Sequence, residues 1–346
     1  MASSVERVPR LSFVLPAYCE ADNLPKLLPR LLAQAELCDE LEIIVVDDHS
    51  HDRTFAVLRE WGAKDPRIKA LRLARNSGSH MAILCGLSTA TGDVAVVLAA
   101  DGQDPPEFTP ELLDAWRKGH HVVWAVRSAR EGETATTRLF SRLYYATMNR
   151  WSSVRLPPAG ADFLLLDKRV IKALVEIPER NTSLLALITW LGFSQTELPY
   201  VKEARASGRS KWTFRKKVRL AVDSLLGFST APLRLATSVG LAFGGAGFLY
   251  AGALFVNKVS GGALFGDTST EGWNALMIVV LVSSGMTMTM LGVVGEYLWR
   301  ALEEVRGRPR FLAEDEVNIG AEQAPRSPNR TLVARTSDTK ASGVGA

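Results

Sequence analysis

The stretch DVAVVLAADGQDPPE, residues 93–107, predicts a buried strand that runs into an acidic loop. Its first half is almost entirely apolar, and Asp101, Gln103 and Asp104 follow where the strand is expected to end. Two prolines then stop the regular structure, because proline has no N–H to donate to a β-ladder. In an open α/β sheet, ligands bind outside the carboxyl ends of the strands, which is the position of this loop.

The oxygen-bearing side chains of this loop suggest a metal site. Asp101, Asp104 and Gln103 offer two carboxylates and an amide oxygen, which are hard ligands suited to a Mg²⁺ or Mn²⁺ that carries phosphates. The alternative is a capped loop before a helix that starts near Glu107. The metal interpretation requires that neighbouring strands also end in groups that bind a ligand.

The surrounding chain alternates apolar runs with amphipathic stretches. Five runs are predicted strands: LSFVLPA from Leu11, EIIVVDD from Glu42, IKALRLA from Ile68, DVAVVLAA from Asp93 and HVVWAVRS from His121. Helical stretches separate them, such as residues 23–35, which gather leucines on one face. This alternation predicts an α/β fold with a mostly parallel sheet and helices on both faces. The strands are apolar nearly throughout, as buried parallel strands are.

The first two strands end in polar groups. No GxGxxG follows the first strand, which argues against a dinucleotide-binding enzyme. Tyr18 and Glu20 are instead expected to hold a base and a ribose, with Asp47 or Asp48 accepting from a base N–H. Asp52 is interpreted as the cap of the next helix.

Basic groups follow the later strands. Arg75 and Asn76, in a turn of small residues before a helix, are positioned to hold phosphate oxygens. Arg127 and Arg130 leave the fifth strand in the same direction, and a solvated surface charge is the alternative for each. Asp162 precedes a further apolar run, which places it at the start of a strand. Metal binding by His49 and His51 is disfavoured, because no third ligand is in view.

Composition sets the class of protein. The chain has 346 residues, a formal charge of +4 and 47% hydrophobic residues, so its bulk charge does not favour nucleic acid. Its three cysteines, Cys19, Cys38 and Cys85, form no metal or disulfide spacing, which suits a reducing cytosol. The first ten residues lack the apolar core of a signal peptide.

The C-terminal part has the pattern of a membrane protein. Residues 212–229 place apolar side chains on one face and basic ones on the other, as in an interfacial helix. Residues 235–256 and 274–295 carry almost no charge, and each is long enough to cross a bilayer. Arginines flank this pair, so the positive-inside rule places both termini in the cytosol. The polar tail after 318 is expected to be disordered.

Taken together, these motifs resemble the polyprenyl-phosphate glycosyltransferases, a group that includes bactoprenol glucosyltransferases and dolichol-phosphate mannose synthases. The motifs that carry the resemblance are PAYCEADN, VVDDHSHDRT, RNSGSHMAI, DGQDPPE, VRSAREGE, GADFLLLD, RASGRSKW and FSTAPLRLAT. They cover roughly residues 11–310 and include the paired membrane helices. The resemblance implies an inverting enzyme of the cell envelope with a GT-A fold, which transfers a hexose or related sugar from a nucleotide sugar to a polyprenyl phosphate.

The resemblance also implies roles for individual residues. The nucleotide-binding group is Pro16, Ala17, Tyr18, Glu20, Asp47, Asp48, Arg75, Asn76 and Ala100. Mg²⁺ or Mn²⁺ would bind Asp101 and Gln103, and the catalytic residues would be Asp162 and Asp101. The acceptor phosphate and sugar group is Asp104, Arg127, Arg130, Arg205, Ser210 and Lys211. Asp162 is either a weak base or a group that orients the acceptor.

The expected organisation follows from the same patterns. It comprises an N-terminal extension at 1–10, a GT-A catalytic domain at 11–211, an interfacial helix at 212–230, a transmembrane hairpin at 231–300 with spans at about 233–256 and 273–297, a cytosolic juxtamembrane segment at 301–317 and a disordered tail at 318–346.

The expected location is the cytoplasmic (inner) membrane, with the catalytic domain in the cytosol. The expected partners are a nucleotide sugar, a polyprenyl phosphate and the membrane, without nucleic acid; a homo-oligomer, dimer or tetramer, is an alternative to a monomer.

Three positions depart from the family pattern. Ala99 stands where the first aspartate of an Asp-x-Asp motif is usual, Leu164 where an arginine is usual, and Trp212 where a tyrosine is usual. Two other interpretations therefore stay open. One is a lapsed transferase that serves as a membrane scaffold. The other is a polymerising synthase, which is disfavoured because two spans build no pore.

Overall fold

The computed structural model describes residues 7–128, 163–179, 183–203, 231–260, 272–320 and 323. The chain forms two compact units, one from residues 1–224 and 307–346 and the other from residues 225–306. The predicted interfacial helix at 212–230 and the tail after 323 lie outside the described residues.

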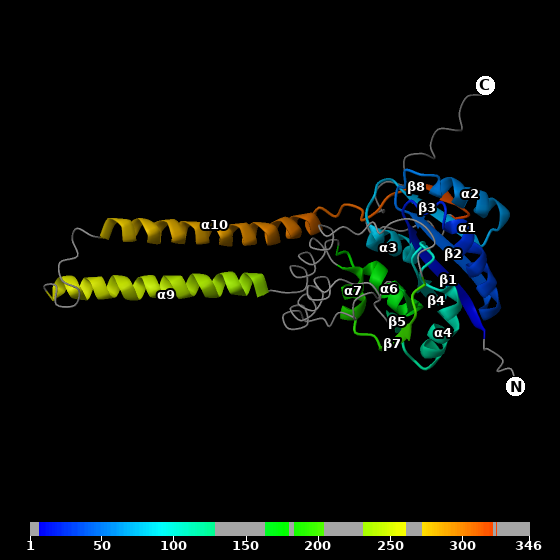
Figure 1. Cartoon of the computed structure of the whole chain (residues 1–346), viewed down its shortest axis with the longest axis horizontal. Coiled ribbons are helices and arrows are strands. Elements are labelled where there is room, and N and C mark those ends of the chain that lie inside the picture. The colour runs from blue at the N-terminus through cyan, green and yellow to red at the C-terminus, as the bar shows by residue number, and fades with distance from the viewer. Residues whose placement is uncertain are drawn as a thin grey trace, which may run out of the picture. The chain divides into compact units, whose positions relative to one another are not determined.

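The first unit is built on an eight-stranded sheet in the order β7-β5-β6-β4-β1-β2-β3-β8 (Figure 1). Its strands are β1 (Val8–Ala17), β2 (Cys38–Asp47), β3 (Ile68–Leu73), β4 (Val94–Val97), β5 (Val122–Arg127), β6 (Phe163–Asp167), β7 (Gln195–Tyr200) and β8 (Ala313–Val317). Its α-helices are α1 (Leu24–Leu32), α2 (Thr54–Lys64), α3 (Ser79–Thr89), α4 (Thr109–Arg117), α6 (Lys168–Glu176) and α7 (Leu184–Trp190). Two short 3₁₀ helices, Ala33–Leu37 and Pro106–Phe108, complete the set.

The sheet is mixed. The pairs β1–β2, β1–β4, β2–β3 and β5–β7 are parallel, whereas β6 is antiparallel to β4 and β5, and β8 is antiparallel to β3. All five strands expected from the sequence are present, and the strand after Asp162 is β6. Two strands were not predicted, β7 and β8, and β8 lies inside the expected juxtamembrane segment at 301–317. Strand β1 also begins earlier than expected, at Val8.

Both faces of the central strands are covered, which explains their continuous apolar sequence. Phe13 and Leu15 of β1 belong to the core that also contains the leucines of α1 and the buried residues of α2 and α4. Val14, on the opposite face, lies against α3, where a Cβ added at Gly86 would come 2.5 Å from Val14 Cγ1. The glycine therefore permits the close approach of α3 to the sheet.

A buried charged network lies near the middle of β1 and β2. Glu42 accepts hydrogen bonds from Ser12 Oγ (2.5 Å), the Thr91 backbone N–H (2.6 Å) and Lys69 Nζ (2.5 Å). Burial opposes ionisation of this carboxyl, but the hydrogen bonds from Lys69, Ser12 and Thr91 outweigh it and lower its pKa. The network joins the middle of β1, the middle of β2 and the start of β3 to the turn before β4.

The second unit contains α9 (Ala231–Val259) and α10 (Gly272–Val305), which lie side by side (Figure 1). Large apolar side chains on both helices are exposed, among them Phe248, Leu249 and Leu298. Within the described residues, one stretch, Ala236–Asn257, is long and apolar enough to cross a membrane. Both predicted spans are helical, and the crossing of a bilayer by either helix stays a prediction.

We predict that Glu42→Gln destabilises the first unit by about 1–3 kcal/mol at pH 7, because Lys69 loses its charged partner. The folded-state pKa of Glu42 lies below its usual 4.5, so its stabilisation is present above pH 4.5 and is lost as the pH falls through the lower folded-state pKa. Thermal unfolding in detergent at pH 7 and at pH 4 measures this, and the gap between variant and wild type should shrink at pH 4.

Glu40→Gln is the matched control. Glu40 lies on the same strand, but its carboxylate is 66% exposed and, within the described residues, its ion-pair partner is Arg10 at the surface. Its loss should leave the unfolding midpoint nearly unchanged. Equal midpoints for the two variants would contradict the stabilising role of the Glu42 network.

Candidate active site

The carboxyl ends of β1, β2 and β4 lie next to one another at one edge of the sheet. Ala17 at the end of β1 pairs with Asp47 at the end of β2, and Val14 pairs with Val97 at the end of β4. Because β6 runs antiparallel to β4, its first residue, Phe163, falls at the same edge. The fold therefore brings the predicted nucleotide loops and the predicted metal loop together.

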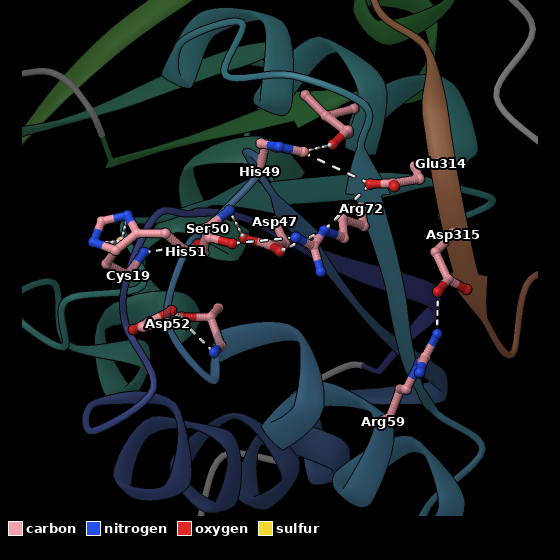
Figure 2. Close-up of polar contacts among 12 residues, drawn as sticks. Cys19, Asp47, His49, Ser50, His51, Asp52, Arg59, Arg72, Glu314 and Asp315 are labelled. Atoms are coloured by element: carbon pink, nitrogen blue, oxygen red, sulfur yellow. Dashed lines mark hydrogen bonds and ion pairs between the residues drawn. The ribbon is translucent and has the colours of Figure 1, made fainter.

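The turn that follows β2 joins three strand ends (Figure 2). The fully buried Asp47 accepts from the Ser50 N–H (3.0 Å), and Ser50 Oγ accepts from the Cys19 N–H (2.8 Å). His49, which has a left-handed φ of 58°, donates from Nδ1 to the Leu73 carbonyl at 3.0 Å, because a carbonyl only accepts. Burial raises the pKa of Asp47, although its hydrogen bonds oppose this. The turn is therefore held by the ends of β1 and β3.

Asp48 binds the backbone of the loop that follows β3 and precedes α3. Its buried carboxylate accepts the Ser77 N–H at 2.6 Å through one oxygen and the Gly78 N–H at 2.8 Å through the other. Gly78 has a φ of 90°, a value that favours glycine, and it immediately precedes α3. Asp48 thereby positions the loop that contains Arg75 and Asn76, the predicted phosphate-binding residues.

The loop after β1 is tied to the start of α2. The Glu20 N–H donates to Thr54 Oγ1 (2.9 Å), and the Glu20 carboxylate accepts from Asn23 Nδ2 (2.5 Å). Asp52 accepts from both the N–H and the hydroxyl of Thr54, at 3.0 and 2.6 Å. Asp52 therefore binds the first N–H of α2, as a capping side chain does, although the N-cap residue itself is Arg53. Glu20 is itself buried, and its proposed contact with a ribose stays a prediction.

The two histidines of this region make separate contacts. His51 packs edge-on against Tyr18, with ring centroids 5.9 Å apart, and Cys19 Sγ lies 3.3 Å from His51 Nδ1. His49 faces the end of β3 instead. Among the described residues, no group of three or more His, Cys, Asp or Glu side chains is arranged to hold a metal ion.

The predicted metal loop presents its two oxygen ligands from one tight turn. Asp101 is 8% exposed, and its Oδ1 accepts from the Gln103 N–H at 3.2 Å. Gly102 between them has a φ of 71°, which favours glycine. The amide nitrogen of Gln103 donates to the Glu203 carbonyl (3.3 Å). A carboxylate and an amide oxygen fit a Mg²⁺ or Mn²⁺ whose other positions are filled by phosphate oxygens and water.

Asp104 connects this loop to the end of β7. It is fully buried, and its Oδ1 accepts from the Tyr200 hydroxyl at 2.7 Å and lies 3.2 Å from Lys202 Nζ. Its Oδ2 accepts from the Ala99 N–H at 3.2 Å. Burial raises the pKa of Tyr200, and the negative charge of Asp104 adds to the effect. These contacts make Asp104 a support of the loop, and its predicted role at the acceptor stays a prediction.

A second set of contacts reinforces the same connection. Arg30 of α1 pairs with Glu107 (2.6 Å) and with Glu203 (2.8 Å), and the Glu203 N–H donates to the Gln103 carbonyl (2.9 Å). Hydrogen bonding from Arg30 lowers the pKa of Glu107. The segment 201–203, which leads into the predicted basic loop, is therefore fastened to the predicted metal loop.

Some predicted site residues lie outside the described residues, and these are Arg130, Asp162, Arg205, Ser210 and Lys211. Arg127 is described: it ends β5 and pairs with Tyr200 in the β5–β7 ladder. Pro16 and Ala17 form the end of β1, and Ala100 is buried beside the metal loop.

Sequence reasoning missed the residues that fasten the metal loop, namely Arg30, Tyr200, Lys202 and Glu203. Tyr200 ends the run QTELPY, which has only weak strand character. Its partner Asp104 lies 96 residues earlier, so no local pattern connects them. The sequence feature that could have pointed to such partners was the presence of two acids, Asp104 and Glu107, beside the predicted metal ligands, since each acid requires a donor or a cation.

A cavity of about 410 Å³ lies away from this edge, beside the start of β1 and the end of α4. Its lining includes Trp116, Arg117, Asp167 and Arg169. Arg117 pairs with Asp114 and Arg169 with Asp167, so its cations are largely neutralised. It holds none of the predicted site residues, and we assign the site to the edge formed by β1, β2 and β4.

Comparison with known proteins shows extended similarity. The family described as "Glycosyl transferase family 2" matches residues 12–175. An uncharacterized glycosyltransferase of Bacillus subtilis, YkcC, is 34% identical over 89% of this chain and 94% of its own. The bactoprenol glucosyl transferase of Shigella phage SfX is 30% identical over 88% of this chain and 98% of its own. The undecaprenyl-phosphate 4-deoxy-4-formamido-L-arabinose transferase of Pseudomonas fluorescens is 34% identical over 96% and 98%.

We predict that Tyr200→Phe lowers the free energy of unfolding of the first unit by about 1–3 kcal/mol, because the buried Asp104 loses a hydrogen-bond donor. Thermal unfolding in detergent, followed by tryptophan fluorescence, measures the change. Tyr250→Phe is the control, since Tyr250 is 60% exposed on α9. A midpoint for Tyr200→Phe that equals the midpoint of this control would contradict the role of the Tyr200–Asp104 contact.

Proposed function

The chain belongs to glycosyl transferase family 2, with an α/β fold of the GT-A type and a mixed sheet, and from this premise we propose that it transfers a sugar from a nucleotide sugar to a polyprenyl phosphate. The observation that carries the proposal is similarity along nearly the whole length of two relatives whose names specify bactoprenol and undecaprenyl phosphate. That similarity includes the C-terminal helices as well as the sheet. The transferred sugar is a hexose or a related sugar.

The donor would bind at the edge formed by β1, β2 and β4. Tyr18 and the turn after β2 offer a flat ring and fixed backbone groups for the nucleoside. The loop that Asp48 holds, with Arg75 and Asn76, would contact phosphate oxygens. Asp101 and Gln103 would hold Mg²⁺ or Mn²⁺, which neutralises charge on the diphosphate leaving group when bound.

The acceptor would need little activation. A polyprenyl phosphate is already an anion at neutral pH, so its oxygen can attack the anomeric carbon while the bond from that carbon to the nucleoside diphosphate breaks. Attack on the side opposite the leaving group inverts the anomeric centre. The main demands are to hold two polyanions together and to stabilise the leaving diphosphate. Arg127, Arg130, Arg205, Ser210 and Lys211 would hold the acceptor, and Asp162 would orient it or accept a proton.

The connection between the two substrate loops supports this division of roles. Tyr200, Lys202 and Glu203 bind the metal loop on one side and continue directly into residues 205–211 on the other. A contact of this kind would set the distance between the donor diphosphate and the acceptor phosphate. The proposed location is the cytosolic face of the membrane, with two membrane-spanning helices.

The metal assignment is tested by Asp101→Ala. We expect the variant to lose transfer to undecaprenyl phosphate from a panel of UDP- and GDP-sugars, and to lose the Mn²⁺ dependence of nucleoside diphosphate binding. Loss of a charge-assisted metal contact of this kind should weaken Mn²⁺ binding at least about tenfold. Asp114→Ala, at an exposed position of α4, is the control. Unchanged Mn²⁺ affinity in Asp101→Ala would remove the metal assignment.

The same assay distinguishes a lapsed enzyme. Ala99 leaves the strand end without a second carboxylate, and its N–H is bonded to Asp104. If the wild type transfers no sugar to any lipid acceptor but Ala99→Asp does, the chain is a membrane scaffold derived from a transferase. We expect instead that the wild type is active and that Ala99→Asp changes donor preference only moderately.

The proposed topology places both termini in the cytosol and residues 257–272 outside. Thr268→Cys should therefore react with a membrane-impermeant thiol reagent in intact cells, whereas Ser327→Cys should react only after permeabilisation. Labelling of wild type, whose three native cysteines lie in the first unit, sets the background. The reverse pattern would overturn the topology.

A further inference from the structure

The strand that follows α10 in the sequence completes the sheet beside the proposed donor site. Strand β8 pairs antiparallel with β3, placing Asp315 opposite Arg72 and Ala313 opposite Leu73. The register shifts between Arg72 and Leu73, at the level where Glu314 lies. Figure 2 shows Glu314 facing Arg72 and His49, on the opposite side of Arg72 from Asp47.

Glu314 begins a chain of contacts that ends at the proposed nucleotide pocket. Its Oε2 lies 3.4 Å from Arg72 Nε and 3.7 Å from His49 Nδ1. Arg72 in turn donates from Nη2 to the Ser50 carbonyl (3.3 Å), and its Nε lies 3.8 Å from Asp47 Oδ2. Ser50 Oγ accepts the N–H of the residue that follows Tyr18 (2.8 Å). Together, these contacts connect β8 with the turn after β2.

Arg72 is the central member of this chain. Its guanidinium lies between an exposed carboxylate, Glu314, and a buried one, Asp47, and its carbon atom Cζ sits 5.8 Å from the Phe55 ring centre. Asp47 is fully buried, so a cation held near it offsets the cost of its desolvation. Glu314 restrains that cation from the outer side, where the Arg72 side chain is 30% exposed.

The docking of β8 does not depend on Glu314. Asp315, the next residue of the strand, forms an ion pair with Arg59 of α2. Asn318 Nδ2 donates to the Gly62 carbonyl (2.7 Å) and the Ile68 carbonyl (2.9 Å). Because these contacts hold the strand on the sheet, the Glu314 carboxylate is available to act on the turn instead.

We propose that Glu314 is a positioning residue of the donor site, which acts through Arg72 and His49 on the turn between Asp47 and Ser50. The donor pocket is then completed by a strand that the chain supplies only after it has formed α9 and α10. This inference rests on the proposed function, because it assigns the site to a nucleotide donor. Glu314 itself touches no substrate.

The test compares Glu314→Gln with Glu316→Gln in the full-length protein in detergent. Glu316 lies two residues further along β8 and is exposed, but it has no contact with Arg72 or His49 in the described structure. The measurements are the dissociation constants of UDP and GDP with Mn²⁺, followed by donor KM and kcat for the nucleotide sugar that is used.

We expect Glu314→Gln to raise the nucleotide dissociation constant and the donor KM by about two- to five-fold, since its ion pair with Arg72 is partly exposed. kcat should stay near the wild-type value, and the difference should shrink in high salt, which screens exposed charges. Glu316→Gln should match wild type. In a cycle with Arg72→Gln, the effects should fail to add, because the two side chains act as one unit.

Three results would overturn the inference. Equal nucleotide affinity for Glu314→Gln and Glu316→Gln would remove the role of Glu314 while leaving the proposed function intact. A lower kcat with unchanged KM, or additive effects with Arg72→Gln, would do the same. If the wild type binds neither UDP nor GDP with Mn²⁺, the proposed function fails first, and the inference fails with it.

Discussion

Burial of carboxylates at the carboxyl ends of the strands is the constraint on which the site depends. Asp47, Asp48 and Asp104 are at most 4% exposed, and a buried charge is costly unless donors surround it. The donors come mainly from backbone N–H groups and from residues on other elements, such as Ser77, Gly78 and Tyr200. Each acid therefore fixes a loop, although Asp47 Oδ2 accepts no hydrogen bond within the described residues and has only the Arg72 guanidinium nearby, at 3.8 Å. The loops together form the edge to which a nucleotide sugar is proposed to bind.

The sequence was sufficient for the features that local patterns determine. The apolar runs of β1 to β5, the strand that starts after Asp162 and the contact of Asp52 with the first N–H of α2 follow from hydropathy and residue type, and the structure confirms them. The family was also recognisable, because eight short motifs occur in a consistent order. In each case the signal lies within a few neighbouring residues.

The features that the sequence did not reveal are pairings between distant segments. β7 and β8 are short edge strands, and β8 is acidic, so neither has the apolar alternation that marks a strand. Edge strands tolerate charge because only part of their surface is covered, and charge there also discourages pairing with other molecules. Asp104 has the sequence context of a metal ligand, yet its burial beside Tyr200 makes it a support. That difference depends on a partner 96 residues away.

The order of the elements along the chain has a physical consequence for the part of the sheet beside the proposed donor site. Strand β3 would be an open edge without β8, and the turn after β2 would lack the carboxylate that restrains Arg72. The segment that supplies both lies beyond α10, so the sheet is complete only when the chain has been made as far as Val317. The proposed acceptor is a membrane lipid. With this order of elements, the donor pocket is complete only in a chain that already contains the apolar helices α9 and α10. The edge strand β8, which is acidic and has little apolar alternation, is thus part of the proposed donor side of the sheet.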